Sequence, residues 1–257
     1  MAGGTPPDGY VRVTAGRCTA VVLSQFADDA RHLLADGTLY DAAARDLAAR
    51  TLNGRGIAYS IALPVSGTRA VVRHNRHGGL FAPLTRDLFL PPTRAPLELA
   101  IALRLRALGV PTPEILMYGT APAPLLLQRA DVVTREVPDA RDLSEYLRAD
   151  TPEPSRRAAW AATRALVSKM NEAGVRHHDL NVKNVLLAES ASGLSAFLLD
   201  VDRVSFETAR SHEVASANAA RLLRSARKWR DERGATFDEH DVAVLGTFAT
   251  AGGRGDA

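Results

Sequence analysis

The sequence contains a single cysteine, few lysines and no long apolar run. Cys18 has no partner for an internal disulfide, which fits a reducing compartment and excludes a cysteine-rich zinc site. Apolar runs such as 124–127 and 197–199 fall well short of the roughly 18 residues that indicate a membrane-spanning helix, so we expect no span. Residues 1–8 lack the basic and apolar regions of a secretory signal. Cytosol is therefore the default location, and attachment to a membrane surface stays open.

Lysine is the scarcest of the common charged residues. Of the 32 basic residues, 29 are arginine and only Lys169, Lys183 and Lys228 are lysine. A genome-wide composition bias accounts for the excess of arginine. The formal net charge of +3 is too small to indicate nucleic-acid binding by itself.

The remaining composition is that of an ordinary globular protein. The chain has 257 residues, 46% apolar and 24% charged, with 19 Gly and 14 Pro. These values exclude collagen-like, disordered and disulfide-scaffold classes. The length is long for one small domain and short for two full ones, so we expect one bilobed unit.

The first half of the sequence alternates strand and helix patterns. We expect a helix over 36–50, two strands over 57–63 and 69–73 joined by a tight turn, and an amphipathic helix over 94–108 that ends at Gly109. Two further strands are expected near 114–118 and 125–137. Residues 1–35 receive no assignment.

Beyond a hinge at Pro138 and Asp139, helix patterns dominate. They cover 143–147, 155–173 and 213–230, with short strands over 185–187 and 197–201. The sequence therefore predicts an α+β fold, with a β-rich N-lobe over 1–137 that holds one main helix and a mostly helical C-lobe over 138–257. The Gly-rich end after Gly246 has a composition that allows disorder.

One motif carries the chemistry. Residues 177–184 read H-H-D-L-N-V-K-N, which matches the H-x-D-L-x-x-x-N spacing of the protein-kinase catalytic loop, and Asp200 follows at the place of the metal-binding aspartate. Phosphoryl transfer needs a carboxylate that receives the proton of the acceptor hydroxyl, here Asp179. It also needs oxygen ligands for Mg²⁺, here Asn184 and Asp200. Each residue alone is also a common turn residue, but their joint spacing is specific.

A kinase-like site also needs groups from the first lobe. Gly54 and Gly56 precede a strand and are candidates to cover nucleotide phosphates, although a plain hairpin explains them equally well. Glu98 is placed to pair with a strand cation, which in protein kinases is a lysine. Because no lysine precedes residue 169, that cation must be an arginine, and Arg73 stands at the expected place.

These residues resemble a kinase-like family, the 3-deoxy-D-manno-octulosonic acid (Kdo) kinases and related lipopolysaccharide core kinases. The resemblance spans roughly residues 50–230. It rests on Gly54–Gly56, on the Val72–Leu80 stretch V-R-H-N-R-H-G-G-L with Arg86-Asp87, on Glu98, on 109–113, and on the motifs around Asp179 and Asp200. The sequence departs from the family pattern at Asn75, where an aromatic is common, at His178, where a small residue is usual, and at Val201, where Phe is usual.

The resemblance implies an activity. Such enzymes use ATP and Mg²⁺ to phosphorylate a sugar hydroxyl of the lipopolysaccharide inner core, the 4-hydroxyl of Kdo on a lipid A precursor, at the cytoplasmic face of the bacterial inner membrane. The acceptor would be a Kdo-lipid A type glycolipid. The family strand arginine looks like Arg73, which makes the missing lysine a family trait.

Basic residues after the Arg73 strand suit an anionic acceptor. A Kdo carboxylate or a lipid A phosphate would need several donors. The candidates are His74, Arg76, His77, Arg86 and, from the catalytic motif, Lys183. A solvated basic strand edge is the alternative.

The tail helix also offers a basic face. Arg221, Arg224 and Lys228 recur at helical spacing, so this face is a candidate for contact with anionic lipid headgroups, and an ordinary solvated face is the alternative.

Three other functions stay open. They are a heptose kinase of the same superfamily, a small-molecule phosphotransferase and an inactive kinase-shaped binding module. The basic acceptor side disfavours cationic small molecules such as aminoglycosides.

Overall fold

The computed structural model of the chain describes residues 5–35, 37–53, 56–75, 88–190 and 193–237. The chain forms two compact units. The first comprises Met1–Ala102 and Glu114–Glu136, and the second comprises Leu103–Pro113 and Val137–Ala257. A single division after residue 137 therefore describes the chain only in part, because 103–113 belong with the second unit.

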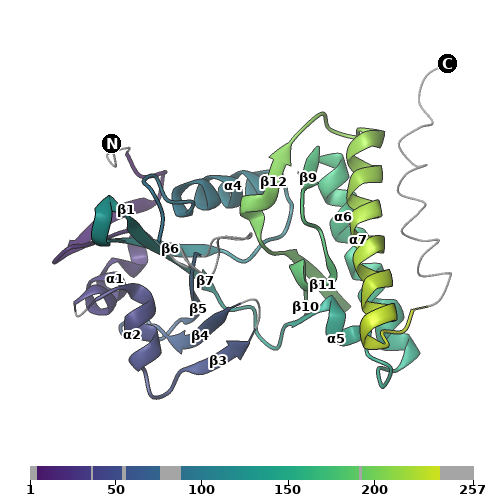
Figure 1. The fold of residues 1–257 in the computed structure, drawn as a ribbon, viewed down its shortest axis with the longest axis horizontal. Helices are drawn as coiled ribbons and strands as arrows, with labels where there is room; N and C mark the ends of the chain where they lie inside the picture. Colours follow the sequence, from purple (N-terminus) through teal and green to yellow (C-terminus); the bar gives the residue numbers. More distant parts are fainter. Residues whose placement is uncertain (1–4, 36, 54–55, 76–87, 191–192, 238–257) are drawn as a thin grey trace. The chain divides into compact units, whose positions relative to one another are not determined.

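The first unit contains a seven-stranded antiparallel sheet in the order β1-β2-β6-β7-β5-β4-β3 (Figure 1). Its strands are β1 (Tyr10–Ala15), β2 (Cys18–Leu23), β3 (Arg50–Asn53), β4 (Ile57–Ala62), β5 (Arg69–His74), β6 (Ile115–Pro122) and β7 (Gln128–Arg135). The predicted hairpin of β4 and β5 is confirmed. The strand expected to begin at Leu125 begins at Gln128 instead, because Pro124–Leu126 form a 3₁₀ turn, η2, with positive φ at Leu125 and Leu126.

The unassigned residues 1–35 contribute much of this unit. They supply β1, β2, the 3₁₀ turn η1 (Ser24–Phe26) and helix α1 (Ala27–Leu34). The helix expected over 36–50 is shorter, since α2 covers Leu39–Arg45 and residues from Arg50 enter β3. Thr38 starts α2 with a capping box, because its side chain accepts from the Asp41 N–H while the Asp41 carboxylate accepts from the Thr38 N–H.

The core of the first unit lies between α1 and α2 and one face of the sheet. Leu39 at the start of α2 lies over Gly119 of β6, where an added Cβ would be 2.8 Å from the leucine Cδ1. Glycine at 119 therefore allows the helix to approach the sheet closely. The larger buried side chains of this core are Val13, Val22, Phe26, Leu33, Leu34, Leu39, Ile61, Leu63, Val72, Leu116, Met117 and Val133.

The helix predicted over 94–108 is confirmed as α4 (Ala95–Ala107). Its apolar side chains Leu99 and Leu105 are buried, and Gly109, with φ of 73°, follows its end. Its first residues belong to the first compact unit and its last to the second.

The second unit is mainly helical. It contains α5 (Leu143–Tyr146), α6 (Glu153–Glu172) and α7 (His212–Arg233), and α6 and α7 lie side by side (Figure 1). Two small sheets complete it, in the orders β11-β10-β8 and β12-β9. Their strands are β8 (Arg141–Asp142), β9 (Val175–His177), β10 (Val185–Ser190), β11 (Gly193–Leu198) and β12 (Val204–Phe206).

The three helices predicted for this half and the strand after the catalytic motif are confirmed. The strand expected over 197–201 ends earlier, at Leu198, because the backbone turns into a left-handed conformation at Asp200. In the described part of the chain, no helix has both the length and the apolar character needed to cross a bilayer.

Candidate functional site

The motif over residues 177–184 forms a tight loop between β9 and β10. Two side-chain amides, Nδ2 of Asn181 and Nδ2 of Asn184, donate to the carbonyl oxygen of Asp179, each at 2.9 Å. The 3₁₀ turn η3 (Val182–Asn184) closes the loop. The five-residue spacing thus brings Asp179 and Asn184 together, as the candidate base and the candidate metal ligand require.

The buried side chain of His177 holds this loop in place. Its ring is fully buried, its Nδ1 accepts from the Asp179 N–H at 3.1 Å, and its Nε2 lies 3.1 Å from the carbonyl oxygen of Leu199. Burial lowers the pKa of His177 below its ordinary value of 6.5, against the opposing effects of the Leu199 carbonyl and of the charges on Asp200 and Asp179. The ring is therefore neutral with its proton on Nε2.

Sequence reasoning gave His177 no role of its own, although it is the first residue of the motif. The structure shows that it joins the candidate base to the segment that carries Asp200, since it bonds to the backbone at Asp179 and Leu199.

Asp200 lies beside Asn184. The Leu199 N–H donates to the carbonyl oxygen of Asn184 at 2.9 Å, and Asp200 adopts φ of 53° and ψ of 44° at the start of the 3₁₀ turn η4 (Val201–Arg203). Few residue types other than glycine adopt this conformation, and aspartate is among those that do so more often. This conformation ends the extended backbone that follows β11, so Asp200 lies at the point where the strand gives way to η4.

The oxygen atoms available here fit Mg²⁺. Because Nδ2 of Asn184 is bonded to the Asp179 carbonyl, the amide oxygen Oδ1 is turned away from that carbonyl, and Asp200 adds a carboxylate. Within the described ranges, no group of three or more His, Cys, Asp and Glu side chains forms a metal site on its own. Two protein ligands completed by phosphate oxygens and water are typical of Mg²⁺ bound with a nucleotide.

Helix α7 supports the loop. The buried Asn218 accepts from the His177 N–H at 3.0 Å and donates to the carbonyl oxygen of Val175 at 2.9 Å. Ser225 Oγ accepts from the Val182 N–H at 3.2 Å. The backbone that carries the candidate residues is thus tied to a long helix.

Lys183 makes its own contacts within the second unit. Its Nζ is 2.9 Å from Oδ2 of Asp142 and 5.2 Å from the ring centroid of Trp229. The Lys183 side chain remains 44% exposed, and its expected contact with the acceptor stays a prediction.

In the first unit, the structure brings Arg73 and Glu98 together in an ion pair. The Glu98 side chain is only 5% exposed. Because an unpaired buried carboxylate destabilises the fold, Glu98 needs the guanidinium as its partner. Arg73 Nη1 also donates to Oδ1 of Asn75 at 3.2 Å. The arginine therefore occupies the position that the sequence assigned to it, on β5 with its partner on α4.

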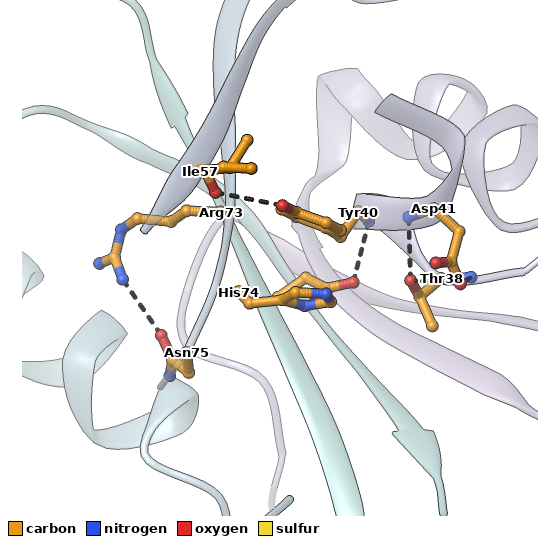
Figure 2. Close-up of polar contacts among 8 residues, drawn as sticks. Thr38, Tyr40, Asp41, Ile57, Arg73, His74 and Asn75 are labelled. Atoms are coloured by element: carbon orange, nitrogen blue, oxygen red, sulfur yellow. Dashed lines mark hydrogen bonds and ion pairs between the residues drawn. The ribbon is translucent and has the colours of Figure 1, made fainter. Parts of the chain in front are cut away.

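His74 is held inside the first unit. Its ring stacks on Tyr40 of α2 with centroids 3.6 Å apart (Figure 2). Its Nδ1 is 2.5 Å from Oδ1 of Asp131. Oδ2 of Asp131 in turn accepts from the Tyr40 N–H at 2.9 Å. With its side chain only 13% exposed, His74 links β5, β7 and α2, which differs from the acceptor contact expected for it.

The other expected residues divide into two groups. Gly56 is half-buried just before β4. Four residues lie outside the described part of the chain, namely Gly54, Arg76, His77 and Arg86.

Fold and site together define a kinase-like α+β protein. The sequence profile of the lipopolysaccharide kinase (Kdo/WaaP) family matches residues 43–245, and the chain belongs to this family. It is therefore a phosphotransferase, which confirms the family expected from the motifs.

Named relatives support this. The chain is 30% identical to the 3-deoxy-D-manno-octulosonic acid kinase of Actinobacillus succinogenes over 74% of this chain and 80% of that protein. It is 31% identical to the enzyme of the same name from Vibrio parahaemolyticus over 75% of this chain and 78% of that protein. Among solved structures, the chain resembles WaaP, solved in complex with acyl carrier protein, with a TM-score of 0.54 and 20% identity over 90% of this chain and 88% of that chain. This likeness concerns the fold.

Proposed function

We propose that this protein transfers the γ-phosphoryl group of ATP to a sugar hydroxyl of the lipopolysaccharide inner core, namely the 4-hydroxyl of Kdo on a lipid A precursor. The observation that carries the proposal is the loop in which Asn184 bonds to Asp179 and lies beside Asp200, in a chain that shares about 30% identity with Kdo kinases. We place the enzyme at the cytoplasmic face of the bacterial inner membrane, as a peripheral protein.

In this proposal Asp179 is the catalytic base. Its carboxylate orients the acceptor hydroxyl and receives its proton as the sugar oxygen bonds to the γ-phosphorus and ADP departs. His177 holds the backbone N–H of Asp179 and so limits the positions open to the carboxylate.

Asn184 and Asp200 would hold Mg²⁺ through Oδ1 and a carboxylate oxygen. When bound, the ion offsets the negative charge of the phosphate oxygens. Neither side chain then needs to change its protonation during transfer.

Arg73 would contact the nucleotide phosphates. Its ion pair with Glu98 and its hydrogen bond to Asn75 orient the planar guanidinium, which presents several N–H donors to phosphate oxygens. Gly54 and Gly56 would cover the phosphates with backbone N–H groups.

The test is mass spectrometry of a Kdo-bearing lipid A precursor after incubation with the purified protein, ATP and Mg²⁺. We expect a gain of one phosphate on Kdo with the unmodified protein and none with Asp179→Asn or Asp200→Asn. Asp150→Asn is the matched control, since this exposed carboxylate pairs with the nearby Arg148.

The other outcomes separate the alternatives. Phosphate on heptose would move the acceptor to that sugar. Binding of ATP without phosphorylation of any core sugar would contradict the Kdo assignment. Absence of both ATP binding and transfer would indicate a binding module.

A further inference from the structure

The hairpin between β6 and β7 ends in an uncovered apolar tip. Leu125 and Leu126 are each 89% exposed, and Pro122 and Pro124 beside them are exposed as well. Both leucines adopt positive φ, 60° and 61°, in the turn η2. Water contacts nearly the whole of two large apolar side chains, an arrangement that typically marks an interaction surface when such residues are adjacent.

A third leucine lies at the same end of the sheet. Leu90 is 73% exposed and follows the buried Phe89, which exchanges two backbone hydrogen bonds of 2.8 Å with Gln128 at the base of the hairpin. We call Leu90, Leu125 and Leu126 the leucine tip.

Two exposed arginines lie near the leucine tip, Arg17 and Arg129. Residues 11–24 and 115–130, which hold the neighbouring strands and turns, contain no Asp or Glu. Arg129 pairs with Ala121 across the base of the hairpin. The exposed Arg17 lies in the turn between β1 and β2, and that turn reaches the same end of the sheet because Thr19 pairs with Thr120.

We propose that the leucine tip inserts into the headgroup layer of an anionic lipid bilayer while the surrounding arginines contact lipid phosphates. Exposed leucines bordered by basic residues match the two components of such a layer, its apolar boundary and its negative surface. The proposal rests on the proposed function only in that a lipid-linked acceptor lies in such a bilayer.

Helix α7 is a weaker candidate for this contact. Its basic residues Arg221, Arg224 and Lys228 supply charge, but of its large apolar residues Leu222 is buried and Leu223 and Trp229 are only half-exposed. Lys228 also lies 4.0 Å from Glu232. The leucine tip offers both the apolar anchor and the charge, so we assign membrane contact to it.

The experiment is flotation of the full-length protein with vesicles, one set of phosphatidylethanolamine and phosphatidylglycerol and one of phosphatidylcholine alone. We expect binding to the anionic set, and at least tenfold weaker partition for the double variant Leu125→Ser/Leu126→Ser. Leu47→Ser is the matched control, because Leu47 is fully exposed elsewhere in the first unit and should bind as the unmodified protein does. Arg17→Ala should weaken binding to anionic vesicles at low salt.

Equal partition of the double serine variant and the Leu47→Ser control would overturn the proposal. Failure of the unmodified protein to float with the anionic vesicles would also overturn it. Melting temperature monitors folding, and it should not fall for the serine variants, because the substituted side chains are exposed.

A second readout separates this proposal from the proposed function. Phosphorylation of a deacylated, water-soluble acceptor should be equal for the unmodified protein and the double variant, whereas phosphorylation of a bilayer-embedded acceptor should drop. Loss of both reactions in the unmodified protein, with vesicle binding intact, would contradict only the kinase assignment.

Discussion

Arg73 and Asn75 lie two residues apart and form a hydrogen bond of 3.2 Å from Nη1 to Oδ1, while Nη2 of the same guanidinium pairs with Glu98. Asn75 is 5% exposed, and its backbone N–H donates to the carbonyl oxygen of Ala130 at 2.8 Å. The guanidinium is therefore held from two sides. An ammonium group lacks the planar fork that reaches both partners at once.

We expect Arg73→Lys to weaken binding of Mg·ATP about tenfold, because loss of one hydrogen bond to a charged group costs about 1.5 kcal/mol and leaves the cation less well oriented. Isothermal titration calorimetry measures the change. Arg69→Lys on the same strand is the control, since Arg69 forks between Glu136 and Ser60 in a separate network. Equal losses in the two variants would show that the position of Arg73 has no special role.

The neutral state of His177 predicts a dependence of stability on pH. Because burial holds the pKa of His177 below 6.5, protonation favours the unfolded chain. The stabilising contribution is complete above pH 6.5 and is lost as the pH falls from there toward the folded-state pKa. Melting temperatures between pH 5 and 8 should fall at the acid end.

His177→Gln isolates this effect. The variant should be less stable at pH 8, because it lacks the buried imidazole whose Nδ1 accepts from the Asp179 N–H. Its stability should decline less on acidification, since the other histidines titrate in both proteins. Parallel pH profiles for the two proteins would refute the assignment of a buried neutral ring.

The hydrogen bonds of Asn218 join α7 to the catalytic loop, and their removal should lower the stability of the protein. Asn218→Ala removes the acceptor of the His177 N–H and the donor to Val175, and it leaves buried polar groups without partners. We expect a loss of roughly 3 kcal/mol in the free energy of unfolding, measured by urea denaturation. Arg224→Ala, at an exposed position of the same helix, should change it by less than about 0.5 kcal/mol.

Gly174 and Gly234 form a matched pair for backbone effects. Each follows a long helix with nearly the same φ, 67° and 66°. A Cβ at Gly174 would lie 2.9 Å from the backbone nitrogen of Ala209, whereas a Cβ at Gly234 would meet nothing within 4 Å. Gly234→Ala should therefore cost only about 1 kcal/mol of left-handed strain, and Gly174→Ala should cost clearly more because backbone must move. Similar urea midpoints for the two variants would contradict this packing.

Local patterns were enough for part of the molecule. Helical spacing of apolar residues predicted α4, α6 and α7, and the motif spacing predicted that Asp179, Asn184 and Asp200 belong to one site. The absence of lysine before residue 169 identified Arg73 as the strand cation, and the ion pair with Glu98 agrees with that placement. These features depend on intervals of a few residues or on the exclusion of other residue types.

The tertiary structure alone determined which distant groups meet. His74 looked like a basic surface residue, yet Asp131, 57 positions later, and Tyr40 enclose its ring. Leu125 and Leu126 looked like the start of a strand, yet the register of β6 with β7 leaves them outside the ladder and exposed. By itself, the sequence determined the chemical groups and their spacing along the chain. Burial and pairing depend on sheet register and on contacts between residues far apart in the sequence, so only the folded chain could determine them.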